Sequence, residues 1–93
     1  AVNAFVGISV LHYLRSAEKR IPDDVSVIVF DDFSSFPYEN PPITVIKQDK
    51  EALGSLAVKV LIDLLENAKV PPRQLLISTQ LIERSSCSSP RIK

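Results

Sequence analysis

One apolar segment, VSVIVF at residues 25–30, constrains the fold more than any other part of the sequence. It is rich in β-branched residues and almost free of polar ones, which is typical of a strand buried on both faces of a parallel sheet covered by helices. In the preceding segment, apolar residues recur at helical spacing and predict a helix over residues 4–19. The residues on that stripe are Val6, Val10, Leu14 and Ala17. A helix followed at once by a buried strand indicates the α/β class.

Downstream of this strand, the sequence predicts a loop, a strand, a helix and a last strand. Residues 33–42 hold three prolines and two serines without periodicity and form the loop, and residues 43–46 form a second short strand. Asp49 is suited to cap a helix that ends near Asn67. The apolar stripe of this helix comprises Leu53, Leu56, Ala57, Val60, Leu61, Leu64 and Leu65. The last strand is predicted over residues 74–82, and the serine-rich segment 85–90 is expected to be poorly ordered.

The length and composition exclude several classes of protein. The chain has 93 residues, enough for one small domain at most. Eleven basic residues balance eleven acidic ones, so the chain has no basic field with which to hold a nucleic-acid backbone. No apolar run approaches the roughly 20 residues that cross a bilayer. A single cysteine fits a reducing compartment, so we expect a cytoplasmic protein. Because the sequence has no methionine and no leader, we expect it to be part of a longer chain.

Enzymatic chemistry has little support among the residues present. The only histidine, His12, falls in the first predicted helix, and the only cysteine, Cys87, falls in the tail, so neither has a second group to activate it. These two residues are too few for a zinc site. Gly7 and Gly54 are the only glycines, and they form no phosphate-binding loop. We therefore expect no catalytic residue, no metal and no cofactor.

Asp31 and Asp32 follow directly after the apolar strand, at the carboxyl end where open α/β sheets bind ligands. Neighbouring strand residues point to opposite faces, so these carboxylates do not form a facing acid and base. One carboxylate at this position can accept hydrogen bonds from the hydroxyls or amides of a ligand. The alternative is that Asp31 caps the following turn and that Asp32 is only solvated.

Two apolar features also have alternative interpretations. The loop aromatics Phe33, Phe36 and Tyr38 either stack on a ligand or a partner, or pack as satellites of the core. The leucine stripe of the second helix is either core or an interface. The sequence alone leaves both pairs of alternatives open.

Four segments stand in a characteristic order and spacing: NAFVGIS at residues 3–9, IPDDVSVIVFDDF at 21–33, PPITVIKQ at 41–48 and LIERSS at 81–86. Leu53-Gly54 stands between the last two, at the start of a helix. Together these segments resemble the lactose-repressor and galactose-repressor family of bacterial transcription regulators. The resemblance covers nearly the whole chain.

The resemblance implies a parallel-sheet, three-layer, periplasmic-binding-protein-like (type I) fold, of which only the C-terminal part is present. Residues 1–42 would belong to the second lobe, residues 43–76 to the first lobe, and residues 77–93 to a strand and tail of the second lobe. A helix-turn-helix domain that docks on operator DNA would lie in the missing part. A small effector, a carbohydrate or a nucleobase, would shift the closure of the two lobes and thereby control operator binding.

The same resemblance assigns candidate site residues. Asp31 matches the carboxylate that binds the effector, Asn3 a polar residue on the effector side, and Gln48 a residue at the edge of the pocket. The residues that match the dimer interface of the family are Val6, Ile8, Val10, Tyr38 and Glu39.

The sequence departs from the family pattern at three positions. Val29 stands where the family has glycine and would add a branched side chain in the turn before the ligand carboxylate. Ala4 replaces an aspartate and removes a polar contact. Glu18 stands near the glycine that ends the first helix, so this cap is expected to be made differently.

Other functions stay possible at this point. A periplasmic solute receptor has the same fold, but the LIERSS ending and the FDDF turn favour the regulators. A small α/β enzyme using Asp31 and Asp32 would lack a base, a nucleophile and an anion cradle. If the lobes are divided as the resemblance implies, the leucine stripe has lost its sheet, and we expect copies of the chain to self-associate as dimers or higher oligomers, or to exchange elements.

Overall fold

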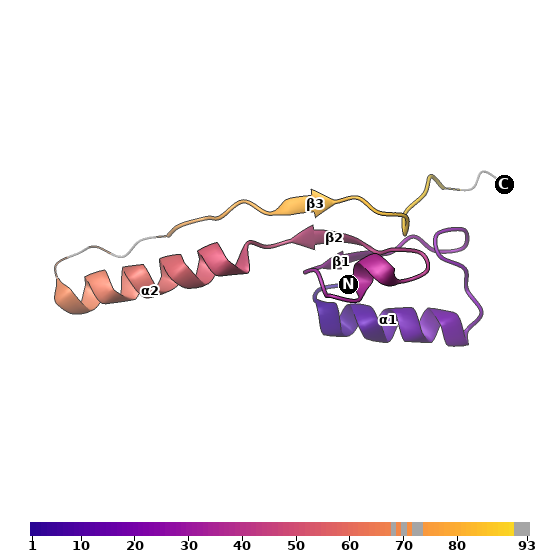
Figure 1. Ribbon diagram of the computed structural model, residues 1–93, viewed down its shortest axis with the longest axis horizontal. Helices are drawn as coiled ribbons and strands as arrows, with labels where there is room; N and C mark the ends of the chain where they lie inside the picture. The colour runs from indigo at the N-terminus through magenta and orange to yellow at the C-terminus, as the bar shows by residue number, and fades with distance from the viewer. Residues whose placement is uncertain (68, 70, 72–73, 91–93) are drawn as a thin grey trace. The chain divides into compact units, whose positions relative to one another are not determined.

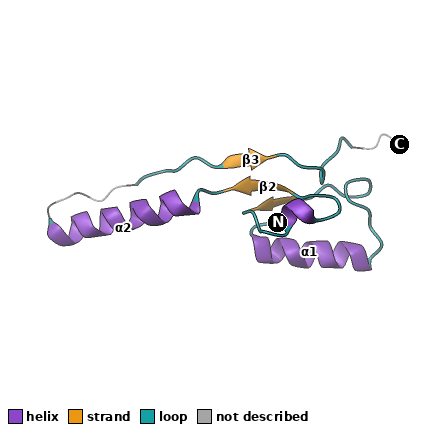
Figure 2. Cartoon of the chain, in the orientation of Figure 1, coloured by secondary structure: helices purple, strands orange, loops and turns teal. Residues whose placement is uncertain are grey.

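The computed structural model describes residues 1–67, 69, 71 and 74–90 (Figure 1). In chain order its elements are α1 (Ala4–Ser16), β1 (Ile28–Phe30), the 3-10 turn η1 (Phe36–Tyr38), β2 (Thr44–Lys47), α2 (Lys50–Glu66) and β3 (Gln80–Ile82) (Figure 2). The described chain divides into two compact units, residues 1–47 with 80–93, and residues 48–79. We call them unit 1 and unit 2.

The sheet of unit 1 is mixed, with strand order β1-β2-β3. β1 and β2 are parallel, with Val29 opposite Val45, whereas β3 runs antiparallel to β2, with Ile82 opposite Val45. The α/β class is therefore confirmed, and the predicted parallel pairing holds for β1 and β2 but not for β3. Beyond β1, the N–H of Phe30 donates to the carbonyl oxygen of Ala1 at 2.9 Å, so the backbone at residue 1 lies along the other edge of β1.

The first strand is shorter than predicted and is not buried on both faces. Val27 and Val29 are buried, but Ile28 between them is 45% exposed. The ladder with β2 covers only residues 28–30, because the N–H of Val27 instead donates to the carbonyl oxygen of Ser86 at 2.9 Å. The last strand is also shorter than the predicted range 74–82, since it pairs with β2 only over Gln80–Ile82.

The helix α1 begins with a side-chain cap and ends on a left-handed residue. The Oδ1 atom of Asn3 accepts the N–H of Val6 at 2.9 Å. At the other end, the N–H of Lys19 donates to the oxygen of Leu14 at 2.9 Å, and the N–H of Glu18 donates to that of Arg15 at 3.1 Å, which is the Schellman arrangement. Glu18 has a φ of +57°. The prediction of a different cap is wrong, because the glutamate adopts the backbone conformation that glycine favours.

The buried face of α1 differs from the predicted stripe. Gly7, Leu11 and Leu14 face the sheet, whereas Val6 of the predicted stripe is exposed and the helix stops before Ala17. Gly7 allows this orientation because the absence of a side chain lets the helix approach Val29 of β1 closely.

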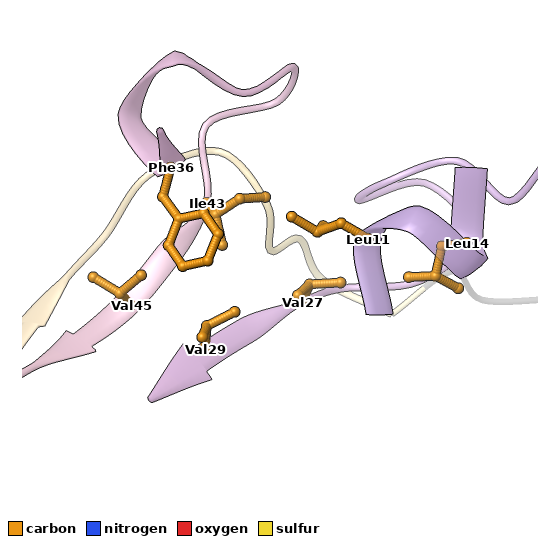
Figure 3. Packing of buried hydrophobic residues seen from close by; sticks show 7 residues of the cluster. All are labelled: Leu11, Leu14, Val27, Val29, Phe36, Ile43 and Val45. Carbon is orange, nitrogen blue, oxygen red and sulfur yellow. The ribbon is translucent and has the colours of Figure 1, made fainter. Parts of the chain in front are cut away.

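The core of unit 1 lies where α1, the two parallel strands and the loop between them converge (Figure 3). Phe36 from the loop is fully buried beside the strand residues, and Ala4, Val10, Ile21 and Ile82 pack around the cluster. The buried apolar residues are Leu11, Leu14, Val27, Val29, Phe36, Ile43 and Val45.

Unit 2 consists of α2 and the segment that follows it. The Oδ1 atom of Asp49 accepts the N–H of Ala52 at 3.0 Å, as the predicted N-cap requires, and the helix ends at Glu66. No residue of α2 is buried. A shallow hollow of about 210 Å³ separates one face of α2 from Leu75 and Ile77. The helical residues that line it are Leu53, Leu56, Ala57 and Val60.

The boundaries of the units do not coincide with the ranges that the resemblance implies. The predicted ranges separate 1–42 from 43–76, whereas β2 (Thr44–Lys47) pairs with β1 inside unit 1. Residues 68, 70, 72, 73 and 91–93 of the ranges 43–76 and 77–93 lie outside the described residues. In the described part of the chain, neither helix is long and apolar enough to span a membrane.

Candidate functional site

Asp31 lies at the carboxyl end of β1 in a left-handed conformation. Its φ is +87°, a region that residues other than glycine rarely adopt. Its N–H donates to the oxygen of Ile46 in β2 at 2.8 Å, which extends the pairing of the two parallel strands. The side chain is partly buried. A left-handed residue at a strand end is typical of sites where the surrounding structure holds a functional group in place.

Asp32 does not remain a solvated carboxylate, because it forms an ion pair with Arg84. The two guanidinium nitrogens each donate to one carboxylate oxygen at 3.0 Å, giving a two-pronged contact between side chains that are both largely shielded from solvent. The Oδ1 atom also accepts the N–H of Phe33 at 2.9 Å. Asp32 thus caps the turn, and the alternative that left Asp32 solvated is wrong.

The ion pair changes the proton affinity of both partners. Hydrogen bonding from Arg84 holds the pKa of Asp32 below its ordinary value, against the opposing effect of burial, and the Phe33 N–H adds to the lowering. The hydrogen bond to Asp32 raises the pKa of Arg84. Both groups therefore stay charged at neutral pH.

Arg84 also binds the beginning of β2. Its Nη1 atom donates to the oxygen of Ile43 at 2.8 Å, and its backbone N–H donates to the Oγ1 atom of Thr44 at 3.0 Å. Sequence reasoning did not single out Arg84, although it is the arginine of the quoted LIERSS segment. An arginine after a strand and an aspartate pair after another strand of one sheet are the signal that could have found it.

Ser86 fixes the segment after β3 to the two parallel strands. It is fully buried, its hydroxyl donates to the oxygen of Val27, and the same hydroxyl accepts the N–H of Thr44 at 2.8 Å. The N–H of Ser85 donates to the oxygen of Pro42 at 3.1 Å. The expected poor order of the serine-rich tail is therefore wrong from Ser85 to Ser88, because hydrogen bonds tie Ser85, Ser86 and Ser88 to Pro42, Val27, Thr44 and Ser26.

Asn3 lies near the same edge of the sheet as Asp31. It stands shortly after Ala1, whose oxygen accepts the N–H of Phe30, and Phe30 directly precedes Asp31. The Oδ1 atom of Asn3 is used as the cap of α1, so its amide nitrogen is the group that can donate to a ligand. Gln48, the third candidate, is partly buried and is the first residue of unit 2.

The five candidate interface residues have different surroundings. Tyr38 is 88% exposed, and Val6 and Ile8 of α1 are also exposed, whereas Val10 packs against the core of unit 1. Glu39 forms an ion pair with Arg15 at 2.7 Å. Phe5, which was not among the candidates, is 79% exposed on α1.

The loop aromatics divide between the two interpretations. Phe36 is fully buried and packs with the core, whereas Phe33 meets its ring edge-on at a centroid distance of 5.8 Å but stays 39% exposed. Tyr38, at 88% exposed, is the most accessible of the three aromatics. Val29, expected in the turn before the ligand carboxylate, lies instead within β1 and is buried under α1, so it does not shape the turn.

The described residues hold no constellation for metal binding or nucleophilic catalysis. No group of three potential metal ligands is found among them. His12 is exposed on α1, and the Sγ atom of Cys87 contacts the oxygen of Val27 at 3.3 Å. Where Asp31 stands, the arrangement offers hydrogen-bond acceptors at a sheet edge, which suits the binding of a polar ligand.

Comparison with known proteins assigns the family. The profile of the periplasmic binding protein-like domain matches residues 1–87. The curated relatives include the transcriptional regulator CelR of Thermobifida fusca, 30% identical over 92% of this chain, and the ribose operon repressor of Escherichia coli, 34% identical over 90%. The chain spans about a quarter of the length of each, 25% and 26% respectively.

Solved structures agree with the sequence relatives. A CelR complex with cellobiose superposes with a TM-score of 0.83 at 30% identity, covering 92% of this chain and 26% of the other. The lac repressor dimer, bound to operator and the anti-inducer ONPF, superposes with a TM-score of 0.78 at 29% identity, covering 92% and 30%. The chain belongs to the periplasmic binding protein-like domain family, as part of the effector-binding domain found in regulators of the lactose-repressor type.

Proposed function

We propose that this chain is the effector-sensing and dimerisation part of a bacterial transcriptional regulator, whose operator binding is controlled by a small molecule, most simply a sugar. The match to CelR covers 92% of this chain but only a quarter of that regulator. The DNA-binding part of the protein would therefore lie outside this chain. The proposal needs no catalytic step and no cofactor, and it implies a cytoplasmic protein.

The observation that carries the proposal is the conformation of Asp31. A carboxylate at the end of a parallel strand, held at a φ of +87°, can accept two hydrogen bonds from neighbouring sugar hydroxyls. Asn3 supports this role because its amide nitrogen is available near the same edge of the sheet. We also propose Gln48 as an effector-binding residue, on the family resemblance alone.

The proposed dimer interface is centred on the outer face of α1. Phe5, Val6 and Ile8 are exposed there, and an apolar surface of this kind favours burial against a second copy. Tyr38 and Glu39 would extend the interface, with Glu39 fixed by its ion pair to Arg15. Val10 would contribute only through its exposed edge, because it packs against the core.

The assignment of lobes is also part of the proposal. We assign unit 1 to the second lobe and unit 2 to the first lobe, which moves the boundary from residue 42 to residue 47. In unit 2, Leu65 is 77% exposed and Leu76 is 90% exposed, so this chain alone leaves apolar area in water. Sedimentation velocity of the chain alone should show dimers or larger species, and a folded monomer at high concentration would contradict this expectation.

Calorimetric titration of the intact protein with ribose, cellobiose and lactose tests the proposed function. We expect one of these sugars to bind, and Asp31→Asn to weaken binding by roughly ten- to a hundredfold, since a lost hydrogen bond to a charged group costs about 1.5–3 kcal/mol. Asp23→Asn is the matched control, because Asp23 is an exposed carboxylate paired at 4.0 Å with Arg20. Binding that is equally strong in Asp31→Asn would remove Asp31 from the site.

A further inference from the structure

We propose that Arg84 and Asp32 are positioning residues for Asp31: their ion pair holds the ligand-facing carboxylate in its left-handed conformation without contacting the ligand. The inference rests on the proposed function, since it concerns the residue that would bind the effector. It assigns a positioning role to Arg84, which belongs neither to the candidate ligand-binding residues nor to the candidate interface residues.

Asp31 is held from both sides along the chain. On the N-terminal side, the N–H of Asp31 donates to the carbonyl oxygen of Ile46 in β2 at 2.8 Å. After it, the carboxylate of Asp32 is clamped by both guanidinium nitrogens of Arg84 at 3.0 Å and accepts the Phe33 N–H at 2.9 Å. The backbone on either side of the strained φ is therefore anchored, which is the condition under which such a conformation persists.

Arg84 is itself rigid, because three separate contacts fix it. Besides the fork to Asp32, its Nη1 atom reaches the oxygen of Ile43 at 2.8 Å, and its backbone N–H reaches Thr44 at 3.0 Å. A planar guanidinium can satisfy Asp32 and Ile43 together. A lysine ammonium at the end of a flexible stem keeps the charge but lacks the fork, so Arg84→Lys separates geometry from charge.

The position of the pair along the chain explains why it controls Asp31 rather than the sheet as a whole. The strand pairing of β1 with β2 runs from Ile28 to Phe30 and ends immediately before Asp31. Beyond that point the Ile46 bond, the Asp32–Arg84 pair and the Phe33 N–H bond to Asp32 hold the turn. Loss of the pair is therefore expected to loosen the turn while the ladder of β1 and β2 remains.

Hydrogen exchange in the intact protein without any ligand tests the positioning directly. In Arg84→Lys we expect the amide of Asp31 to exchange at least about tenfold faster, while the amides of Gly7 and Leu11 in α1 keep their wild-type rates. A merely structural role would accelerate exchange in α1 as well. Asp32→Asn is the second variant, and Arg20→Lys, which alters the exposed pair of Arg20 with Asp24, is the control.

A double-mutant cycle on sugar affinity gives the second measurement. For whichever of ribose, cellobiose and lactose binds the wild-type protein, Arg84→Lys should weaken binding about tenfold or more in the wild-type background and less than about twofold in Asp31→Asn, since coupled residues are not additive. Equal losses in the two backgrounds, or unchanged exchange at Asp31, would overturn the inference. If none of the three sugars binds, the sugar assignment of the proposed function fails, and the exchange measurement alone decides the role of Arg84.

Discussion

Gly7 of α1 lies directly against Val29 of β1, so closely that a Cβ atom on Gly7 would come within 2.8 Å of both Cγ atoms of Val29. Both methyl groups belong to a fully buried, branched side chain in the core, which cannot move aside. Gly7→Ala is therefore expected to destabilise unit 1 by about 1–3 kcal/mol through overpacking, although alanine is the better helix former. Urea unfolding followed by circular dichroism measures the change, and Val29→Ala in the same chain should reduce the penalty.

Gly54 of α2 provides the matched control, because apart from its chain neighbours and the nearby backbone of its own helix nothing lies within 4 Å of the position where its Cβ would stand. Only the helix propensity acts there, so Gly54→Ala should stabilise α2 by about 1 kcal/mol, with a gain in helical ellipticity. The same substitution thus has opposite signs at the only two glycines of the chain. A stabilising Gly7→Ala would show that α1 can shift away from the sheet.

The contact between α1 and β1 also shows which structural features the sequence patterns could not predict. The apolar periodicity located both helices and the first two strands, because such patterns depend on local spacing. It found the buried face of α1 only in part: Leu14 is buried and Val10 packs against the core as predicted, but Gly7 and Leu11 were missed, since a glycine carries no hydrophobic signal and Val6 is as apolar as Leu11. It extended the last strand to residues 74–82, because pairing with β2, which covers Gln80–Ile82 only, depends on residues far away in the chain.

Glu18 is a second site where a single substitution should stabilise the protein. Glu18 follows the C-terminal end of α1 with a φ of +57°, a left-handed conformation that glycine adopts without steric cost. Glu18→Gly is expected to raise the free energy of unfolding by about 1 kcal/mol, since the left-handed conformation costs roughly 1–2 kcal/mol for other residues. Glu18→Ala removes the charge but keeps the strained conformation. If its melting temperature rises as much as that of Glu18→Gly, the stabilisation comes from removing the charge and not from relieving the strain.

Ser86→Ala should destabilise the protein by about 1–3 kcal/mol, the cost of leaving a buried hydrogen-bonding group unsatisfied. The hydroxyl is the acceptor for the Thr44 N–H at 2.8 Å and lies in a fully buried position, where water cannot replace it. Ser85→Ala is the control, because Ser85 is exposed and bonds to Pro42 through its backbone N–H, which alanine retains. Equal unfolding midpoints for the two variants would contradict this role of Ser86.

The Asp32–Arg84 pair should make the free energy of unfolding depend on pH in the acidic range. Because the pKa of Asp32 is lower in the folded protein than in the unfolded chain, where it is about 3.9, its contribution is complete above the unfolded value and is lost as the pH falls through the folded one. Asp32→Asn should therefore cost about 1.5–3 kcal/mol between pH 5 and 7 and progressively less below about pH 4. Urea unfolding across this range measures the difference. A constant difference down to pH 2 would contradict the lowered pKa.

The candidate site was only partly predictable for a related reason. Asp31 and Asp32 were found because they follow an apolar strand, but their different roles depend on Arg84, which is separated from Asp32 by 52 positions. The double role of Asn3 as helix cap and candidate ligand residue could be read in part from its place before α1. The left-handed φ of Asp31 has no sequence signature, since it results from the bond to Ile46 and from the clamp on Asp32.

Asp31 combines strain with proposed function, and the two can be separated by a pair of variants. Asp31→Gly and Asp31→Ala both remove the carboxylate, but only glycine adopts a φ of +87° without steric cost. We expect the glycine variant to unfold at higher urea than the alanine variant, by about 1 kcal/mol, while both lose sugar affinity in the intact protein to a similar extent. Equal stability of the two variants would mean that the turn relaxes once the side chain is gone. Sugar binding retained in the glycine variant would mean that the backbone, and not the carboxylate, holds the ligand.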